Sequence, residues 1–390
     1  MKRSNRLANL PPYPFARWAA RVGVARQEGI DVIHLDIGSP DMPPEDPVID
    51  ALCESAHQPD VHGYPGYRGI PALREAVAEY YGRRFGVELD PDNQVVPLLG
   101  SKEGIVNMAL ACLDTGDVAL VPDPGYAPYT MGTAMAGAEV CTFPLLAEND
   151  FLPDLAAIPV DARDRAKLMW LNYPNNPTGA TASLEFLAQA LDFCRQHSIL
   201  LCHDAPYCDV TYDGYVAPSV LQIPGAEEVA VEFNSLSKTS NMAGWRIGMA
   251  VGDPEALAAL AQVKSNVDSG IFRPLQEAAV QALAVTDDWL AARNALYRER
   301  IGVILAALQE VGMAATRPRA TLYVWAQVPP GWESEPFASD LLDQTGVAIA
   351  PGPFFGPSGE GYVRISVTAP TERVREAMGR LDRFMRSTSQ

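Results

Sequence analysis

The chain has 390 residues, of which 48% are hydrophobic and 20% charged, a composition typical of a folded protein with one large domain and a smaller one. Its formal net charge of -18 argues against nucleic acids and anionic membranes as partners. Six cysteines without a Cys-x-x-Cys pair predict reduced thiols in a cytoplasmic protein, and five histidines without a His-x-x-x-His spacing argue against a metal site. We also expect no signal peptide and no membrane-spanning segment.

Residues 1–45 are expected to form an N-terminal arm that is part of the smaller domain. Pro11-Pro12-Tyr13-Pro14 opposes helix formation, after which Phe15–Glu28 is predicted to be helical. Asp31–Ile37 alternates as a strand and ends in the turn Gly38-Ser-Pro40-Asp41. Two further helices are predicted at 46–56 and 70–85, with a loop rich in glycine and aromatic residues between them.

From residue 94 to residue 251, short apolar strands alternate with helices. Strands are predicted at 94–99, 117–121, 138–144, 167–171, 199–202, 229–233 and 247–251. This order predicts an α/β fold for residues 46–280, with a mainly parallel sheet and helices on both faces. Residues 281–390 are expected to form a smaller α+β domain, with a long helical stretch over 274–309, strands at 321–327, 347–349 and 363–367, and a final helix over 371–386.

Lys238 stands out because an apolar strand leads into the Ser-rich stretch Asn234-Ser-Leu-Ser-Lys238, predicted to be a loop. Lysine side chains normally stay in water. If this one is desolvated beside another cation, the pKa of its ammonium falls and the neutral amine becomes a nucleophile for a carbonyl carbon. Taken alone, the stretch leaves open a surface lysine in a polar loop.

The turn Gly100-Ser101-Lys102-Glu103-Gly104 lies between a predicted strand and a predicted helix. Backbone N–H groups at a helix start favour an anion, so a phosphate group could bind here. An N-cap role for Ser101 is the alternative. The chain has neither a Walker loop nor a Gly-x-Gly-x-x-Gly motif, which disfavours a nucleotide fold. Further donors for one phosphate are available from Ser235, Ser237, Lys238 and Arg246.

Polar residues follow three of the predicted strands: Asn176, Asp204 with Tyr207, and Lys238. Ligands of open parallel sheets bind outside the carboxyl ends of the strands. A carboxylate at the end of an apolar strand stays ionised only beside a cation, such as a protonated ring nitrogen. A helix cap or an ion pair for Asp204 and a turn role for Asn176 are the alternatives.

Tyr173-Pro-Asn-Asn-Pro-Thr-Gly179 and Ser235-Leu-Ser-Lys238, with Arg246 eight residues later, resemble the class I aminotransferases among the fold-type I pyridoxal-phosphate enzymes. The likeness runs from about Asp31 to the C-terminus. It implies a large domain with a seven-stranded sheet, pyridoxal 5'-phosphate as cofactor, amino acid and keto acid substrates, and a homodimer with shared active sites. Within the family, the stretches 165–179, 203–204 and 264–270 look most like bacterial LL-diaminopimelate aminotransferases.

The resemblance also implies roles for residues of this chain. Lys238 would bond to the cofactor and act as general base, and Asp204 would pair with the cofactor's ring nitrogen. Tyr207 and Asn176 would hydrogen-bond the phenolic oxygen of the ring, on which Tyr126 would stack. The phosphate would be held by Gly100, Ser101, Lys102, Ser235, Ser237 and Arg246, and by Tyr64 across the dimer interface. Arg364 would bind the substrate α-carboxylate, with Gly38 and Asn176 close by.

The sequence departs from the family at Tyr67, where plant-type members carry a glutamate that grips the distal end of the substrate. Lys264, Asn266 and Arg273 are candidates for distal contacts, with helix-surface roles as the alternative. Other amino donors (alanine, aspartate, aromatic amino acids or succinyl-diaminopimelate) and a β-lyase or decarboxylase reaction stay open. A ligand-sensing transcription regulator is disfavoured, because no basic helix-turn-helix precedes residue 31.

Overall fold

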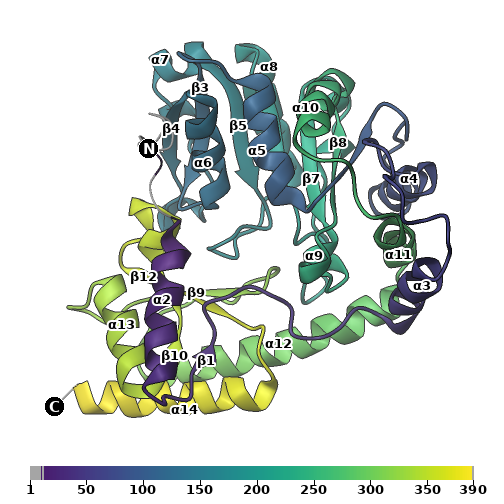
Figure 1. Cartoon of the computed structure of the whole chain (residues 1–390). Helices are drawn as coiled ribbons and strands as arrows, with labels where there is room; N and C mark the ends of the chain where they lie inside the picture. Colours follow the sequence, from purple (N-terminus) through teal and green to yellow (C-terminus); the bar gives the residue numbers. More distant parts are fainter. Residues whose placement is uncertain (1–9, 11–12, 389–390) are drawn as a thin grey trace, which may run out of the picture.

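The computed structural model describes residue 10 and residues 13–388, and its largest element is a seven-stranded sheet (Figure 1). The strand order is β2-β8-β7-β6-β5-β3-β4. β8 runs antiparallel to both of its neighbours, and the other neighbouring pairs are parallel. The expected mainly parallel sheet is therefore confirmed. The strands are β2 (Val95–Leu98), β3 (Val118–Asp123), β4 (Glu139–Pro144), β5 (Ala166–Asn172), β6 (Leu200–Asp204), β7 (Ala230–Ser235) and β8 (Gly248–Gly252).

Helices cover both faces of this sheet because its central strands are apolar on both sides. In β5, Leu168 and Trp170 join a buried cluster that includes Met108, whereas Met169 and Leu171 join a second cluster that includes Leu187. Successive strand residues point to opposite faces, so these two sets mark the two layers of helices. The helices around the sheet are α3 (Asp46–Ala56), α4 (Pro71–Phe85), α5 (Ser101–Cys112), α6 (Ala127–Ala136), α7 (Val160–Arg165), α8 (Leu184–His197), α10 (Pro254–Val267) and α11 (Arg273–Leu283).

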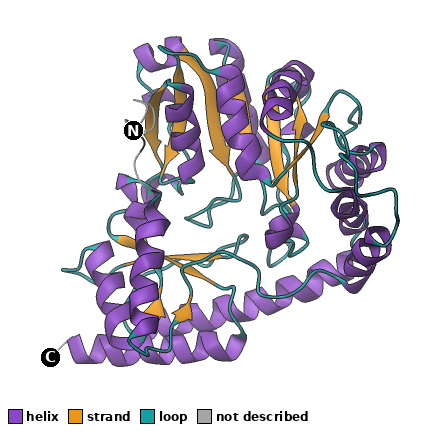
Figure 2. Ribbon diagram, viewed as in Figure 1, coloured by secondary structure: helices purple, strands orange, loops and turns teal. Residues whose placement is uncertain are grey.

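Two small sheets form a second layer below the large one, with their own buried core (Figure 2). One has the antiparallel order β11-β12-β9, and the other is the parallel pair β1-β10. These strands are β1 (Ile33–His34), β9 (Tyr323–Gln327), β10 (Val347–Ala348), β11 (Ala350–Pro351) and β12 (Tyr362–Ser366). Around them pack α2 (Pro14–Gln27), α12 (Asp287–Glu310), α13 (Ser334–Thr345) and α14 (Thr371–Thr388). The division of the chain at residues 45 and 280 stays a prediction.

Three predicted elements were wrong in detail. The helical stretch expected over 274–309 is two helices, because Thr286 caps α12 by accepting a hydrogen bond from the Trp289 N–H at 3.3 Å. The strand expected over 31–37 is shortened to Ile33–His34, which pairs with Val347–Ala348, although the Leu35 N–H still donates to the Ala348 carbonyl at 2.8 Å. Lys238, expected in a loop, lies in the short helix α9 (Leu236–Thr239).

Candidate active site

The carboxyl ends of β5, β6 and β7 bring polar residues to one edge of the large sheet. Asn172 and Asp204 are register partners, and the Asn172 side chain donates to the Asp204 carbonyl at 2.7 Å. This edge faces the small sheets across a cavity of about 570 Å³. Of the predicted site residues, those that line it are Gly38, Ser101, Lys102, Tyr126, Asn176, Asp204, Tyr207, Ser235, Ser237, Lys238, Arg246 and Arg364.

Lys238 enters the cavity from α9, which directly continues β7. Ser235 caps this short helix by accepting from the Ser237 N–H, so the lysine is held one turn beyond the strand end. Its ammonium donates a short hydrogen bond to the Gly38 carbonyl. Burial, with the nearby Arg364 and Arg246 cations, lowers the pKa of Lys238 and outweighs the opposing effect of Tyr323. Lys238 is therefore a suitable nucleophile and base.

Asp204 is a buried carboxylate with one satisfied oxygen. Its Oδ2 accepts from the Tyr129 hydroxyl at 2.6 Å, and its Oδ1 has no partner within the described part of the chain. Burial raises the pKa of Asp204 to about 6, although Tyr129 and His203 oppose the shift. Tyr129 is itself fixed by stacking on Trp170, with ring centroids 5.0 Å apart. An unpaired carboxylate oxygen facing a cavity is suited to a cationic N–H donor.

The start of α5 forms a cradle for an anion together with Arg246. A Cβ on Gly100 would lie 2.2 Å from Nη2 of Arg246, so the backbone of this turn and the guanidinium approach more closely than a side chain would allow. Arg246 also reaches the Ser237 hydroxyl at 3.4 Å. Lys102 lies beside the cradle, with its ammonium 4.4 Å from the centre of the Tyr13 ring. Burial and the Arg246 cation lower its pKa. The backbone N–H groups at the start of α5 and these cations suit a phosphate group.

Arg364 forms the opposite wall, on β12 of the small sheet. Its guanidinium donates to Oδ1 of Asn176 at 2.7 Å and to the Asp36 carbonyl at 2.6 Å, and its Nε has no partner within residues 13–388. No carboxylate among the described residues pairs with it. Aromatic rings surround it at 4.1 to 5.6 Å, from Tyr323, Phe355 and Phe15. A buried arginine of this kind can bind a carboxylate as a bidentate partner.

Sequence reasoning missed several cavity residues, above all Tyr323. Its hydroxyl lies 2.9 Å from that of Tyr207, and a Cβ on Gly38 would lie 1.9 Å from the Tyr323 oxygen. Tyr13, Phe15 and Phe355 also line the cavity. A tyrosine in an apolar strand and aromatic residues in a Pro-rich stretch resemble ordinary core residues, so no local signal identified them.

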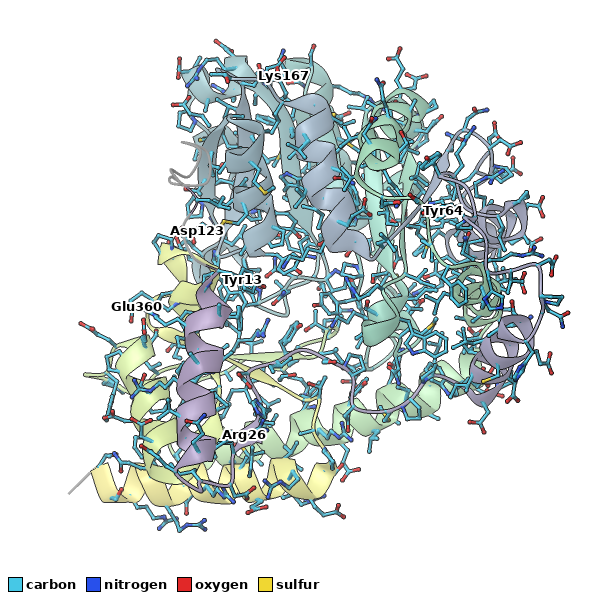
Figure 3. All side chains as sticks on the ribbon, in the orientation of Figure 1. Tyr13, Arg26, Tyr64, Asp123, Lys167 and Glu360 are labelled. Atoms are coloured by element: carbon cyan, nitrogen blue, oxygen red, sulfur yellow. The ribbon has the colours of Figure 1, made fainter. Side chains whose placement is uncertain are left out.

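Other predicted residues lie outside the cavity of this single chain. Tyr64 is 90% exposed and Tyr67 is 54% exposed, and Figure 3 shows Tyr64 well away from Tyr13 at the cavity. Lys264 is buried in an ion cluster with Asp268 at 2.6 Å and does not line the cavity of this single chain, so its distal contact stays a prediction. Asn266 bonds the Gln262 carbonyl, and Arg273 pairs with Glu277 and Asp60.

Within the described residues, no helix is both long and apolar enough to cross a membrane.

Known proteins resemble this chain over nearly all of its length. Residues 30–381 match the family described as aminotransferase class I and II. The LL-diaminopimelate aminotransferase of Moorella thermoacetica is 50% identical over 385 residues, which are 99% of each chain. A protein of the same name from Desulforudis audaxviator is 51% identical over 97% of this chain and 96% of its own. Among solved structures, apo-BacF from Bacillus subtilis superimposes with a TM-score of 0.95 at 36% identity, covering 98% of both chains.

Proposed function

Since the chain belongs to the class I and II aminotransferase family, we propose that it transfers an amino group between LL-2,6-diaminopimelate and 2-oxoglutarate with pyridoxal 5'-phosphate as cofactor. The substrate assignment is supported by the 50% identity, over 99% of each chain, to a protein named for this activity. A cytoplasmic location and a homodimer with shared active sites belong to the same proposal.

The residues of the cavity fit pyridoxal phosphate at three separate points. The Asp204 Oδ1, which no described residue satisfies, suits the protonated ring nitrogen. The cradle at Gly100, where a Cβ would meet Arg246, suits the phosphate. Lys238 lies in the same cavity with a lowered pKa, as bonding to an aldehyde requires. When bound, the cofactor supplies an electron sink for the carbon that loses its proton.

The other cavity residues are suited to contact the cofactor ring and its phosphate. Tyr126 lines the cavity and can cover one face of the ring, with its own ring packed edge-on against Tyr129 at 5.8 Å. The side-chain oxygen of Asn176 is taken by Arg364, so its amide N–H groups stay available for the phenolic oxygen of the ring. Tyr207 can donate to the same oxygen. Ser101, Lys102, Ser235, Ser237 and Arg246 surround the phosphate position.

Lys238 and Arg364 act on the substrate. Arg364 binds the α-carboxylate and is oriented by Asn176 and the Asp36 carbonyl. Lys238, whose pKa is lowered mainly by burial, would take the proton from the substrate α-carbon and return it to the carbon that gains a proton in the transfer. Release of the keto acid product before the second keto acid binds gives ping-pong kinetics.

A panel of amino donors tests the substrate. Purified enzyme supplied with pyridoxal phosphate and 2-oxoglutarate should form glutamate from LL-diaminopimelate much faster than from alanine, aspartate or aromatic amino acids. Lys238→Ala is the control and should abolish both turnover and the absorbance of lysine-bound cofactor, because Lys102, the other described lysine that lines the cavity, lies beside the phosphate cradle. Preference for another donor would remove the diaminopimelate assignment. Release of ammonia in place of glutamate would indicate a lyase.

A further inference from the structure

Tyr323 lies where the two walls of the cavity meet, and its hydroxyl bridges them. The residue begins β9 of the small sheet and is 2% exposed. Its oxygen lies 2.9 Å from the hydroxyl of Tyr207, which follows β6 of the large sheet. The two rings meet edge to face at 5.6 Å, so the hydroxyls are held by packing as well as by the hydrogen bond.

The surroundings fix Tyr323 in this position. The Arg364 guanidinium lies 4.1 Å from the centre of its ring. On the other side there is no room for a side chain at position 38, because a Cβ there would lie 1.9 Å from the phenolic oxygen. The Tyr323 hydroxyl is therefore built into the site at the contact with Gly38, whose carbonyl accepts from Lys238.

The direction of the hydrogen bond decides what Tyr207 can do. Each phenol has one proton, so a Tyr207 hydroxyl that donates to Tyr323 has no proton left for another acceptor. If Tyr323 donates, the Tyr207 proton is free. Either hydroxyl can be the donor at this distance. The anionic phenolic oxygen of a bound cofactor would be a stronger acceptor than the neutral Tyr323 hydroxyl, so the Tyr207 proton would go to the cofactor and the Tyr323 proton to Tyr207.

We propose that Tyr323 is a positioning residue that donates its hydroxyl proton to Tyr207 and so directs the Tyr207 proton toward the phenolic oxygen of the cofactor ring. This inference rests on the proposed function. A phenylalanine at position 323 would cover the Arg364 guanidinium as well as the tyrosine does, so the proposed role belongs to the Tyr323 hydroxyl. Donation by Tyr323 also strengthens Tyr207 as a donor, since hydrogen bonds in a chain polarise one another.

A pH titration of the bound cofactor's absorbance tests this role. A hydrogen bond to the phenolic oxygen stabilises its anionic form, so a weaker bond raises the pH midpoint of the absorbance change. Tyr323→Phe should raise the midpoint by about half a pH unit to one unit. Tyr207→Phe should raise it further. In the Tyr207→Phe background, Tyr323→Phe should add no shift, because its effect passes through Tyr207.

Other groups near Tyr323 also titrate and must be held constant. Those that act on the two phenols or lie beside them are Lys238, Arg364, Asp204, Tyr13 and Tyr126, and all of them are kept in the four proteins compared. Tyr297→Phe is a matched control, because this buried tyrosine of α12 has a hydroxyl without a partner among the described residues and lies outside the cavity. Its midpoint should equal that of the wild type.

The outcomes separate the two proposals. A wild-type protein that takes up no pyridoxal phosphate overturns the proposed function and the role of Tyr323 together. Two results would overturn the role of Tyr323 alone while the wild type binds and titrates the cofactor. One is a Tyr323→Phe midpoint equal to that of the wild type. The other is a Tyr323→Phe shift of the same size in the wild-type and Tyr207→Phe backgrounds. If Tyr323→Phe fails to fold, 3-fluorotyrosine at position 323 decides, because it keeps the hydroxyl and makes it more acidic. The midpoint should then fall, and an unchanged or higher midpoint contradicts the proposal.

Discussion

The Asp204 carboxyl group binds its proton more tightly in the folded chain than in water, since burial raises its pKa to about 6. An unfolded aspartate has a pKa of about 3.9. Between these two values the folded state holds more protons than the unfolded state, so this group stabilises the fold at low pH and the stabilisation is lost as the pH rises through 6. A cation beside the carboxylate would remove that loss, which gives a bound cofactor a stabilising role.

The Asp204→Asn variant isolates the pH-dependent contribution of the Asp204 carboxyl group to the free energy of unfolding. In protein stripped of cofactor, the free energy of unfolding of the wild type relative to the variant should fall by about 2.5 kcal/mol between about pH 4 and about pH 8. Urea unfolding at each pH measures it. Asp209→Asn is the contrasting variant, because Asp209 is paired with Arg84 at 2.7 Å and bonded by Tyr80, and its loss should lower stability at about pH 8. A constant difference between wild type and Asp204→Asn would contradict the assignment.

At the scale of elements, α12 fixes the position of α9. Arg293 of α12 is 4% exposed, and its guanidinium donates to the carbonyls of Lys238 at 3.0 Å and Asp209 at 2.7 Å and, in a short contact, to that of Thr239. The last carbonyls of a helix have no partner within it. Arg293 therefore satisfies the end of the short helix that carries Lys238.

Arg293→Lys should lower the free energy of unfolding by roughly 2–4 kcal/mol, because an ammonium cannot reach several carbonyls at once and leaves buried acceptors unpaired. Denaturant unfolding measures the change. Arg298→Lys is the control on the same helix, since its ion pair with Asp213 is 60% exposed on the arginine side and should matter by about 0.5 kcal/mol or less. Equal effects of the two substitutions would show that Arg293 does not hold α9.

The sequence predicted helices and strands correctly where a single physical rule decided the local structure. The apolar run at Lys167–Leu171 and its polar end predicted β5 and its place at the site, because buried strands are short and apolar on both faces. The break between α11 and α12 was missed, because a single threonine cap inside a long helical pattern is a weak signal. The start of α9 was missed for the same reason, since four residues are too few to show a period.

Site residues followed from sequence only where a motif or a strand end marked them. Lys238, Asp204 and Arg364 come together in the cavity from stretches that the motifs had identified. Tyr129 and Tyr323 could not be found, because their importance lies in contacts with Asp204 and Tyr207 that join distant parts of the chain. Tyr64 carries a predicted role that only a second copy could fulfil.

At the scale of the whole molecule, the proposed homodimer predicts that Tyr64 of each subunit contributes to the active site of the other. Lys238→Ala and Tyr64→Ala proteins, each with little activity alone, should regain activity when unfolded together and refolded as a mixture. Random pairing makes half of the dimers hybrids, each with one complete site, so activity should reach about a quarter of wild type. Mixed activity equal to the mean of the separate proteins would contradict sharing of Tyr64. Tyr215→Ala, at a residue that does not line the cavity, is the control partner and should behave as wild type does in the mixture.

The pairing of β1 with β10 sets the order in which the molecule can be completed during synthesis. Ile33–His34 leaves the ribosome early, but its partner Val347–Ala348 is made near the end of the chain. At about 5–20 residues per second, the early strand waits roughly 15 to 60 s for its partner. Ile33 and Leu35, both buried in the finished fold, are without their final packing during that time. The apolar side chains of residues 33–35 therefore stay available for contacts with other nascent chains until almost all of the protein has been made.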